Sequence, residues 1–93
     1  MADTIKYHIN LPVDTDEYKL PAAQNLVKSA LTGFNILSID TWVATLGAAG
    51  YRVSVIFNPP LPVNQNALVE PVEKAAVAAG WILDGPVTAW IHP

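Results

Sequence analysis

Apolar and polar residues alternate one by one near the N-terminus, which is the pattern of a β-strand with one buried face. The apolar positions are Ile5, Tyr7, Ile9 and Leu11, and the polar positions between them are Thr4, Lys6, His8 and Asn10. The alternation returns in residues 51–57, where Tyr51, Val53, Val55 and Phe57 share one side. The sequence therefore predicts two strands of similar character, one in each half of the chain.

An amphipathic helix is predicted to follow the first strand. Its apolar residues recur with the i, i+3, i+4, i+7 spacing at Ala23, Leu26, Val27, Ala30 and Leu31. Pro21 suits the first turn, since proline has no N–H to leave unpaired there. Gly33 lies where a C′ glycine would end the helix.

A second helix is predicted after the strand at 51–57, and Pro59, Pro60 and Pro62 are expected to lie outside the sheet. Its start stays open, because Pro71 suits a first turn while Leu68 already fits the helical pattern. Gly80 is expected to end it.

Two further strands complete the pattern. In residues 36–43 the apolar side toward the helices is assigned to Leu37, Ile39 and Val43, and the other side to Ile36, Ser38, Asp40 and Trp42. The segment "GAAG" at 47–50 is read as a hairpin turn into the strand at 51–57. The last strand is expected from Pro86 to Ile91, with Val87, Ala89 and Ile91 toward the helices.

The predicted order is β-α-β-β-α-β within a single domain of 93 residues, and the two halves resemble each other. A displacement of 48 positions aligns the strand at 5–10 with that at 53–58 and brings Trp42 onto Trp90. Two βαβ units with right-handed crossovers give an α+β, ferredoxin-like sandwich. Its four-stranded antiparallel sheet would have the order 4-1-3-2, with both helices on one face.

The composition changes this picture in one respect, since 52% of the residues are hydrophobic and only 14% are charged. Ordinary soluble domains carry about 25% charged residues, so we expect part of the surface to be covered by a second copy or another protein. The net charge of −3 and the single, scattered basic residues disfavour nucleic acid. The start of the chain has no secretory signal pattern and no apolar run predicts a membrane span, so the expected location is cytoplasmic.

If the helices cover one sheet face, alternation turns a defined set of side chains to the other. This open sheet face is predicted to comprise Lys6, His8, Asn10, Ser38, Asp40, Trp42, Arg52, Ser54, Ile56, Thr88, Trp90 and His92. Two tryptophans on one sheet face are typical of a contact surface. The predicted partner-binding residues are Trp42, Trp90, His8, Arg52, Ile56 and Asp40. The alternative is that either tryptophan points into the core after a register shift, as we expect Trp81 and Phe34 to do.

Catalysis on this face is the less favoured interpretation. His8 and Asp40 could form an acid–base pair beside Arg52, but a solvent-facing strand histidine is more often only a polar residue. We expect no catalytic residues and no cofactor. We also expect no metal, because His8 and His92 lack a nearby third ligand. RNA-recognition sheets place aromatics on the two central strands, which here carry polar residues.

The sequence thus predicts a non-enzymatic protein-binding or assembly subunit that forms a dimer or larger oligomer, or binds a protein partner, through its open sheet face. The alternative from another class is a small enzyme of the dimeric α+β-barrel type, with a pocket enclosed between two sheets.

Overall fold

The computed structural model describes residues 5–44, 49–58, 64 and 66–92. Its elements are the strand β1 (Lys6–Leu11), helix α1 (Leu20–Ala30), strands β2 (Ile36–Val43) and β3 (Tyr51–Phe57), helix α2 (Asn66–Ala78) and strand β4 (Thr88–Ile91). The domain is α+β, and its element order is the predicted one. The four strands form one antiparallel sheet in the order β2-β3-β1-β4, which is the predicted order read from the other edge.

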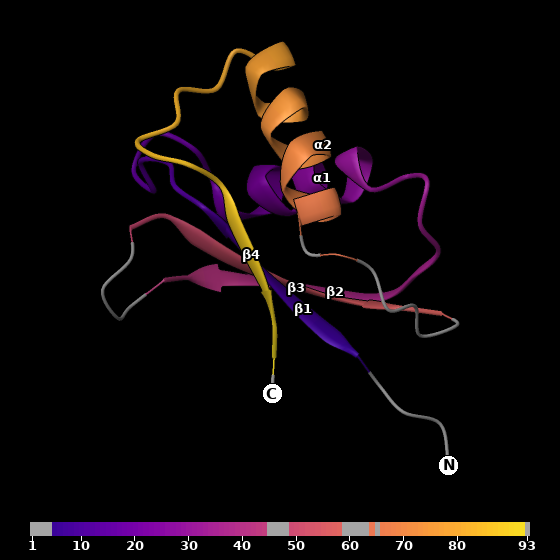
Figure 1. Cartoon of the computed structure of the whole chain (residues 1–93). Coiled ribbons are helices and arrows are strands. Elements are labelled where there is room, and N and C mark those ends of the chain that lie inside the picture. Colours follow the sequence, from indigo (N-terminus) through magenta and orange to yellow (C-terminus); the bar gives the residue numbers. More distant parts are fainter. Residues whose placement is uncertain (1–4, 45–48, 59–63, 65, 93) are drawn as a thin grey trace.

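Both helices lie on the same side of the sheet (Figure 1). The core fills the space between these layers, and β1 supplies Tyr7, Ile9 and Leu11 to it, each fully buried. These residues pair with Val55, Val53 and Tyr51 of β3. The alternate apolar residues of the two central strands, β1 and β3, therefore form the sheet side of the core.

Helix α1 begins as predicted and ends differently. Pro21 lies in its first turn. The helix ends at Ala30 with Leu31 as its C-cap, and Gly33 does not have a positive φ, so the prediction that Gly33 is the C′ glycine is wrong. Leu31 is fully buried and donates its N–H to the Val27 carbonyl, while the Phe34 N–H bonds to the Leu31 carbonyl. A buried leucine and a tight turn therefore end this helix instead of a left-handed glycine.

Helix α2 ends at the predicted glycine. Gly80 has φ +78°, its N–H bonds to the Val77 carbonyl at 3.0 Å, and the Trp81 N–H bonds to the Ala76 carbonyl at 2.9 Å. This pair of bonds is the Schellman motif.

The start of α2 resolves the open question about Pro71. The helix begins at Asn66, so Pro71 is inside it, not in its first turn. The Asn64 side chain accepts the Asn66 N–H at 2.9 Å, which provides an acceptor at the helix start. The prediction for Pro59, Pro60 and Pro62 lies outside the described residues.

Strand β2 departs from the predicted alternation at its first residues. A β-bulge between Ile36 and Ser38 shifts the register, so Ile36 pairs with Phe57 and packs against the core. Leu37 was assigned to the helix side, but it is 62% exposed. Ile36 was assigned to the open face, but it packs against the core instead. The extra residue of a bulge reverses the side on which preceding residues point. From Ser38 onward the predicted sides hold.

Glycine is required where β3 begins. Gly50 has φ +105°, and its carbonyl accepts the N–H of Ala44 at 2.9 Å. Residues 47 and 48 of the predicted turn lie outside the described residues. The last strand begins at Thr88, two residues later than predicted. Within the described ranges, neither helix has the length and apolar character needed to cross a bilayer.

Candidate functional site

The structure brings all six predicted binding residues onto the open sheet face. Strand pairing places His8 between Ser54 and Trp90, and Asn10 between Arg52 and Thr88. Asp40 lies opposite Ser54, Trp42 lies opposite Arg52, and Ile56 lies opposite Lys6. Apart from Trp42, each of these side chains is next in sequence to a residue that lies in or against the core, so alternation directs it away from the helices. Trp42 lies two positions after Asp40 in the same strand and therefore shares its face.

Four rings and one guanidinium meet at the centre of this face. The ring centroid of His8 is 5.7 Å from that of Trp42, 5.8 Å from that of Trp90 and 4.8 Å from that of His92. The guanidinium carbon of Arg52 lies 4.7 Å from the Trp90 ring centroid, in cation–π geometry. We call these five residues, His8, Trp42, Arg52, Trp90 and His92, the His8 cluster.

The cluster buries polar residues that the pattern predicted to face solvent. His8 is 9% exposed and Asn10 is 8% exposed, and Ser54 is also buried, although they lie on the open face. The indoles come from β2 and β4, the two edge strands, and contact the imidazole of His8 on the central strand. Large side chains from the edges therefore cover the middle of the sheet, and the expectation of a solvent-facing His8 is wrong.

Several buried polar atoms under this cover have no hydrogen-bond partner among the described residues. They are both ring nitrogens of His8, the side-chain oxygen of Asn10 and Nε of Arg52. A buried polar atom without a partner costs about 1–3 kcal/mol, and such groups cluster at functional sites. The open face therefore carries unused donors and acceptors beside exposed aromatic surface.

Electrostatics favour the neutral form of His8. Burial lowers the pKa of His8 below its ordinary value of 6.5, and the neighbouring His92, Arg52 and Lys6 lower it further. The one ion pair in the described part of the chain joins Lys74 and Glu70 on the surface of α2, so Asp40 has none with Arg52. The structure does not assemble the His8–Asp40 acid–base pair.

The lowered pKa of His8 predicts that acidification destabilises the fold. The unfolded chain binds this proton more readily, so its proton count exceeds that of the folded state as the pH falls below about 6.5. The free energy of unfolding should therefore fall as the pH is lowered through and below about 6.5. His8→Gln should reduce this dependence, and His92→Gln should reduce it less, because burial of His8 remains. Urea midpoints across this range measure it, and an unchanged slope in His8→Gln would contradict it.

Two other concave regions lie away from the His8 cluster. One, of about 420 Å³, is lined by Asp14, Glu17, Asp84, Val43 and Ile82 among others. The other, of about 560 Å³, lies between the helices beside Trp81. The described residues include no group of three acidic or histidine side chains placed to hold a metal ion. Among the described residues that line them, neither concavity contains unpartnered buried polar atoms of the kind found under the indoles.

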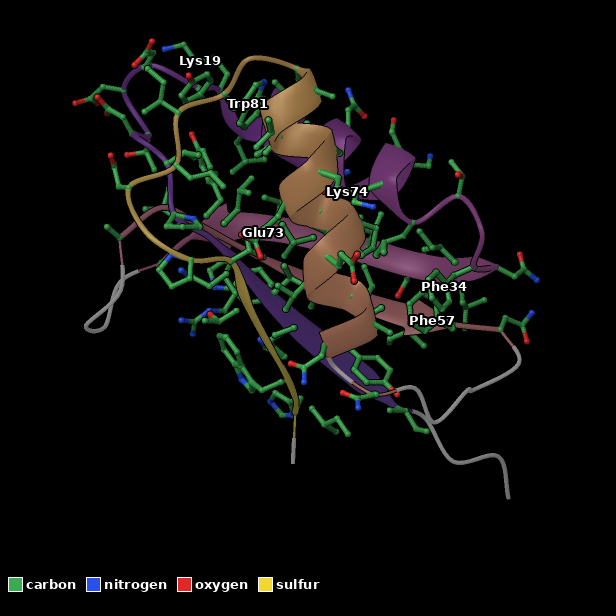
Figure 2. All side chains as sticks on the ribbon, turned by 45° about the horizontal axis from the view of Figure 1, so that its top comes forward. Lys19, Phe34, Phe57, Glu73, Lys74 and Trp81 are labelled. Carbon is green, nitrogen blue, oxygen red and sulfur yellow. The ribbon has the colours of Figure 1, made fainter. Side chains whose placement is uncertain are left out.

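The two remaining aromatic predictions are partly confirmed. Phe34 stacks on Phe57 with ring centroids 4.9 Å apart, and Figure 2 shows the two rings side by side. Trp81 stacks on Tyr18 at 4.4 Å and packs against the core, but it is only partly buried. Both therefore border the core, on the helix side of the sheet.

No protein-family model matches this chain, and no curated protein is significantly similar to it. The geometry of the site is therefore the basis for the proposed function.

Proposed function

We propose that this chain is a ferredoxin-like domain, built from two similar βαβ halves, that binds a protein through its open sheet face. The His8 cluster is the observation that carries the proposal. Protein–protein contact sites are enriched in tryptophan and arginine, which bury much area and offer donors at their tips. The cluster has two tryptophans and an arginine within one patch, and Trp42 is 38% exposed.

The unpartnered atoms of His8 and Arg52 in the cluster, and of the neighbouring Asn10, indicate which groups a bound surface would have to supply. Arg52 Nε is a donor, Asn10 Oδ1 is an acceptor, and the imidazole of His8 is one of each when neutral. A protein surface with backbone or side-chain polar groups can pair with all three once the indoles move aside. A bound protein would therefore supply hydrogen-bond partners to these unpaired buried atoms, in addition to covering apolar area.

The enzymatic alternative receives less support from the geometry. General acid–base catalysis needs a group whose pKa is matched to the reaction and whose partner lies within hydrogen-bond reach. His8 has no hydrogen-bond partner in the described residues, and its surroundings favour the neutral form. A second sheet packed on this face would bury His8 further and would therefore disfavour its charged form more strongly.

The proposal predicts that Trp90→Ala and Trp42→Ala weaken association much more than folding. Loss of an interface tryptophan costs about 2 kcal/mol or more, equivalent to roughly a 30-fold weaker association constant. Folding should be less affected, because both indoles cover polar residues instead of filling the core. Sedimentation equilibrium on the self-associating protein gives the constants, and urea unfolding gives the stability.

Trp81→Ala is the matched control, because this tryptophan packs on Tyr18 on the helix side of the sheet. It should lower stability and leave association unchanged. The opposite pattern, with Trp42 and Trp90 variants unfolding readily and associating normally, would remove the open face as the binding site. A wild-type protein that stays monomeric at high micromolar concentration would identify the partner as a different protein.

A further inference from the structure

Strand β2 is an edge strand with little protection against pairing. It is eight residues long, contains no lysine and no proline, and carries one charge, Asp40. Three of the exposed large hydrophobic side chains, Leu37, Trp42 and Val43, belong to it. The other edge, β4, has only four residues. Edge strands are usually kept from pairing by charges, prolines or short length, and β2 has few of these devices.

The backbone groups on the free side of β2 can be assigned. The Ala44 N–H bonds to the Gly50 carbonyl, and the register continues with Trp42 opposite Arg52 and Asp40 opposite Ser54. Residues of an antiparallel strand point their N–H and C=O groups alternately to one neighbour and to the other. The N–H and C=O groups of Ile39, Thr41 and Val43 therefore point away from β3, toward a side on which the described chain places no strand.

We propose that β2 pairs with β2 of a second copy, antiparallel, about a two-fold axis at Thr41. Thr41 then lies opposite the partner's Thr41, Ile39 opposite the partner's Val43, and Val43 opposite the partner's Ile39. These three opposed pairs each exchange two hydrogen bonds, so every outward-pointing group from Ile39 to Val43 is used. The result is one eight-stranded sheet with all four helices on the same side.

The register follows from hydrogen bonding and charge. Two β2 strands can bond only where a residue whose N–H and C=O point away from β3 lies opposite another such residue of the partner. This requirement excludes every register that pairs Ile39 with the partner's Asp40 or Thr41 with the partner's Trp42. Registers centred on Asp40 or Trp42 keep only two hydrogen-bonded pairs. The bulge between Ile36 and Ser38 removes the third pair for a centre at Asp40, and the end of β2 at Val43 removes it for a centre at Trp42. A centre at Asp40 would also place two carboxylates face to face, which is unfavourable.

Charge and apolar surface indicate that the occupant is a second copy. With the axis at Thr41, Asp40 lies opposite the partner's Trp42, whose indole N–H can donate to a carboxylate. Asp40 has no ion pair within the described residues of its own chain. Val43 is 46% exposed on the helix side, and this register covers it with the partner's Ile39. Because the axis is two-fold, each of these contacts forms twice.

Cysteine cross-linking tests the register directly, because the chain has no cysteine of its own. Thr41→Cys should form an intermolecular disulfide on mild oxidation, since its α-carbon would lie about 5.5 Å from that of its counterpart. Asp40→Cys is the matched control, because diagonal α-carbons about 7–8 Å apart are too distant for a disulfide. Cross-linking of Asp40→Cys in preference to Thr41→Cys would overturn the proposed register.

Hydrogen exchange on the unmodified protein gives a second test, because Thr41→Cys removes the hydroxyl that lies 3.0 Å from Gln24. The amides of Ile39, Thr41 and Val43 should become as protected as those of Asp40 and Trp42 when the protein concentration is raised. Rapid exchange of the three outward amides at every concentration would overturn the pairing. Trp90 lies on the opposite edge strand from Thr41. Trp90→Ala should therefore weaken open-face binding and leave the cross-linking of Thr41→Cys unchanged. The two proposals can therefore fail separately.

Discussion

Replacing Gly50 with alanine should lower the free energy of unfolding by about 4 kcal/mol or more, which is enough to unfold many domains of this size. Gly50 has φ +105°, a conformation that alanine adopts only with strain. An added Cβ would also overlap the Leu11 carbonyl oxygen and lie 2.8 Å from the Val13 backbone nitrogen. These are backbone atoms of the central strand and its continuation, so they cannot move aside as a flexible side chain would.

Gly33→Ala is the matched control for Gly50→Ala. Gly33 has no positive φ, and no atom lies within 4 Å of the position that an alanine Cβ would take there. The stability of Gly33→Ala should therefore remain within about 0.5 kcal/mol of the wild type. Urea denaturation of both variants measures the difference. Similar stabilities for the two would show that β3 can begin without the close approach to β1.

Phe57→Ala should lower the free energy of unfolding by about 3–5 kcal/mol, because it leaves a cavity in the core. Phe57 is buried, and its ring lies 5.7 Å from that of Tyr7 and 4.9 Å from that of Phe34. Leu37→Ala is the informative control, since the alternation assigned Leu37 to the same core. Its exposed position in the bulge predicts a change of less than about 1 kcal/mol. A large loss for Leu37→Ala would place it in the core and contradict the bulge.

The element order and the strand order followed from the sequence because local pattern and chain topology agree. In β1 and β3 every second residue is large and apolar, so only one register buries them all. The right-handed crossover then leaves few arrangements of four strands and two helices. The membership of the open face followed from the same alternation.

Other features depend on contacts between distant residues and have no local signature. The bulge between Ile36 and Ser38 adds one residue to β2. Nothing in the alternation of that segment shows whether Ile36 or Leu37 is the residue that points toward the core. Gly33 and Gly80 follow similar helices, yet only Gly80 takes the left-handed conformation. At Gly33 the buried Leu31 has already ended the helix.

The burial of His8 was not predictable for a related reason. The alternation predicts the face on which a side chain lies, but it does not predict how much of that side chain a neighbouring indole covers. Trp42 and Trp90 reach His8 from strands on either side, and one of these strands is separated from it by β3. The aromatic residues themselves were the available signal, since each is large enough to cover an adjacent strand.

The pairing of β1 with β4 has a consequence for the order in which the domain can assemble on the ribosome. Tyr7 pairs with Ile91, and the His92 N–H bonds to the Lys6 carbonyl at 2.8 Å, so residues more than 80 positions apart are neighbours. During synthesis β1 emerges before β2, β3 and β4, and its β4 side stays unpaired until β4 has left the exit tunnel. The nascent chain can form the β2–β3 hairpin and its pairing with β1 earlier, whereas closure of the sheet must wait until β4 has been synthesised.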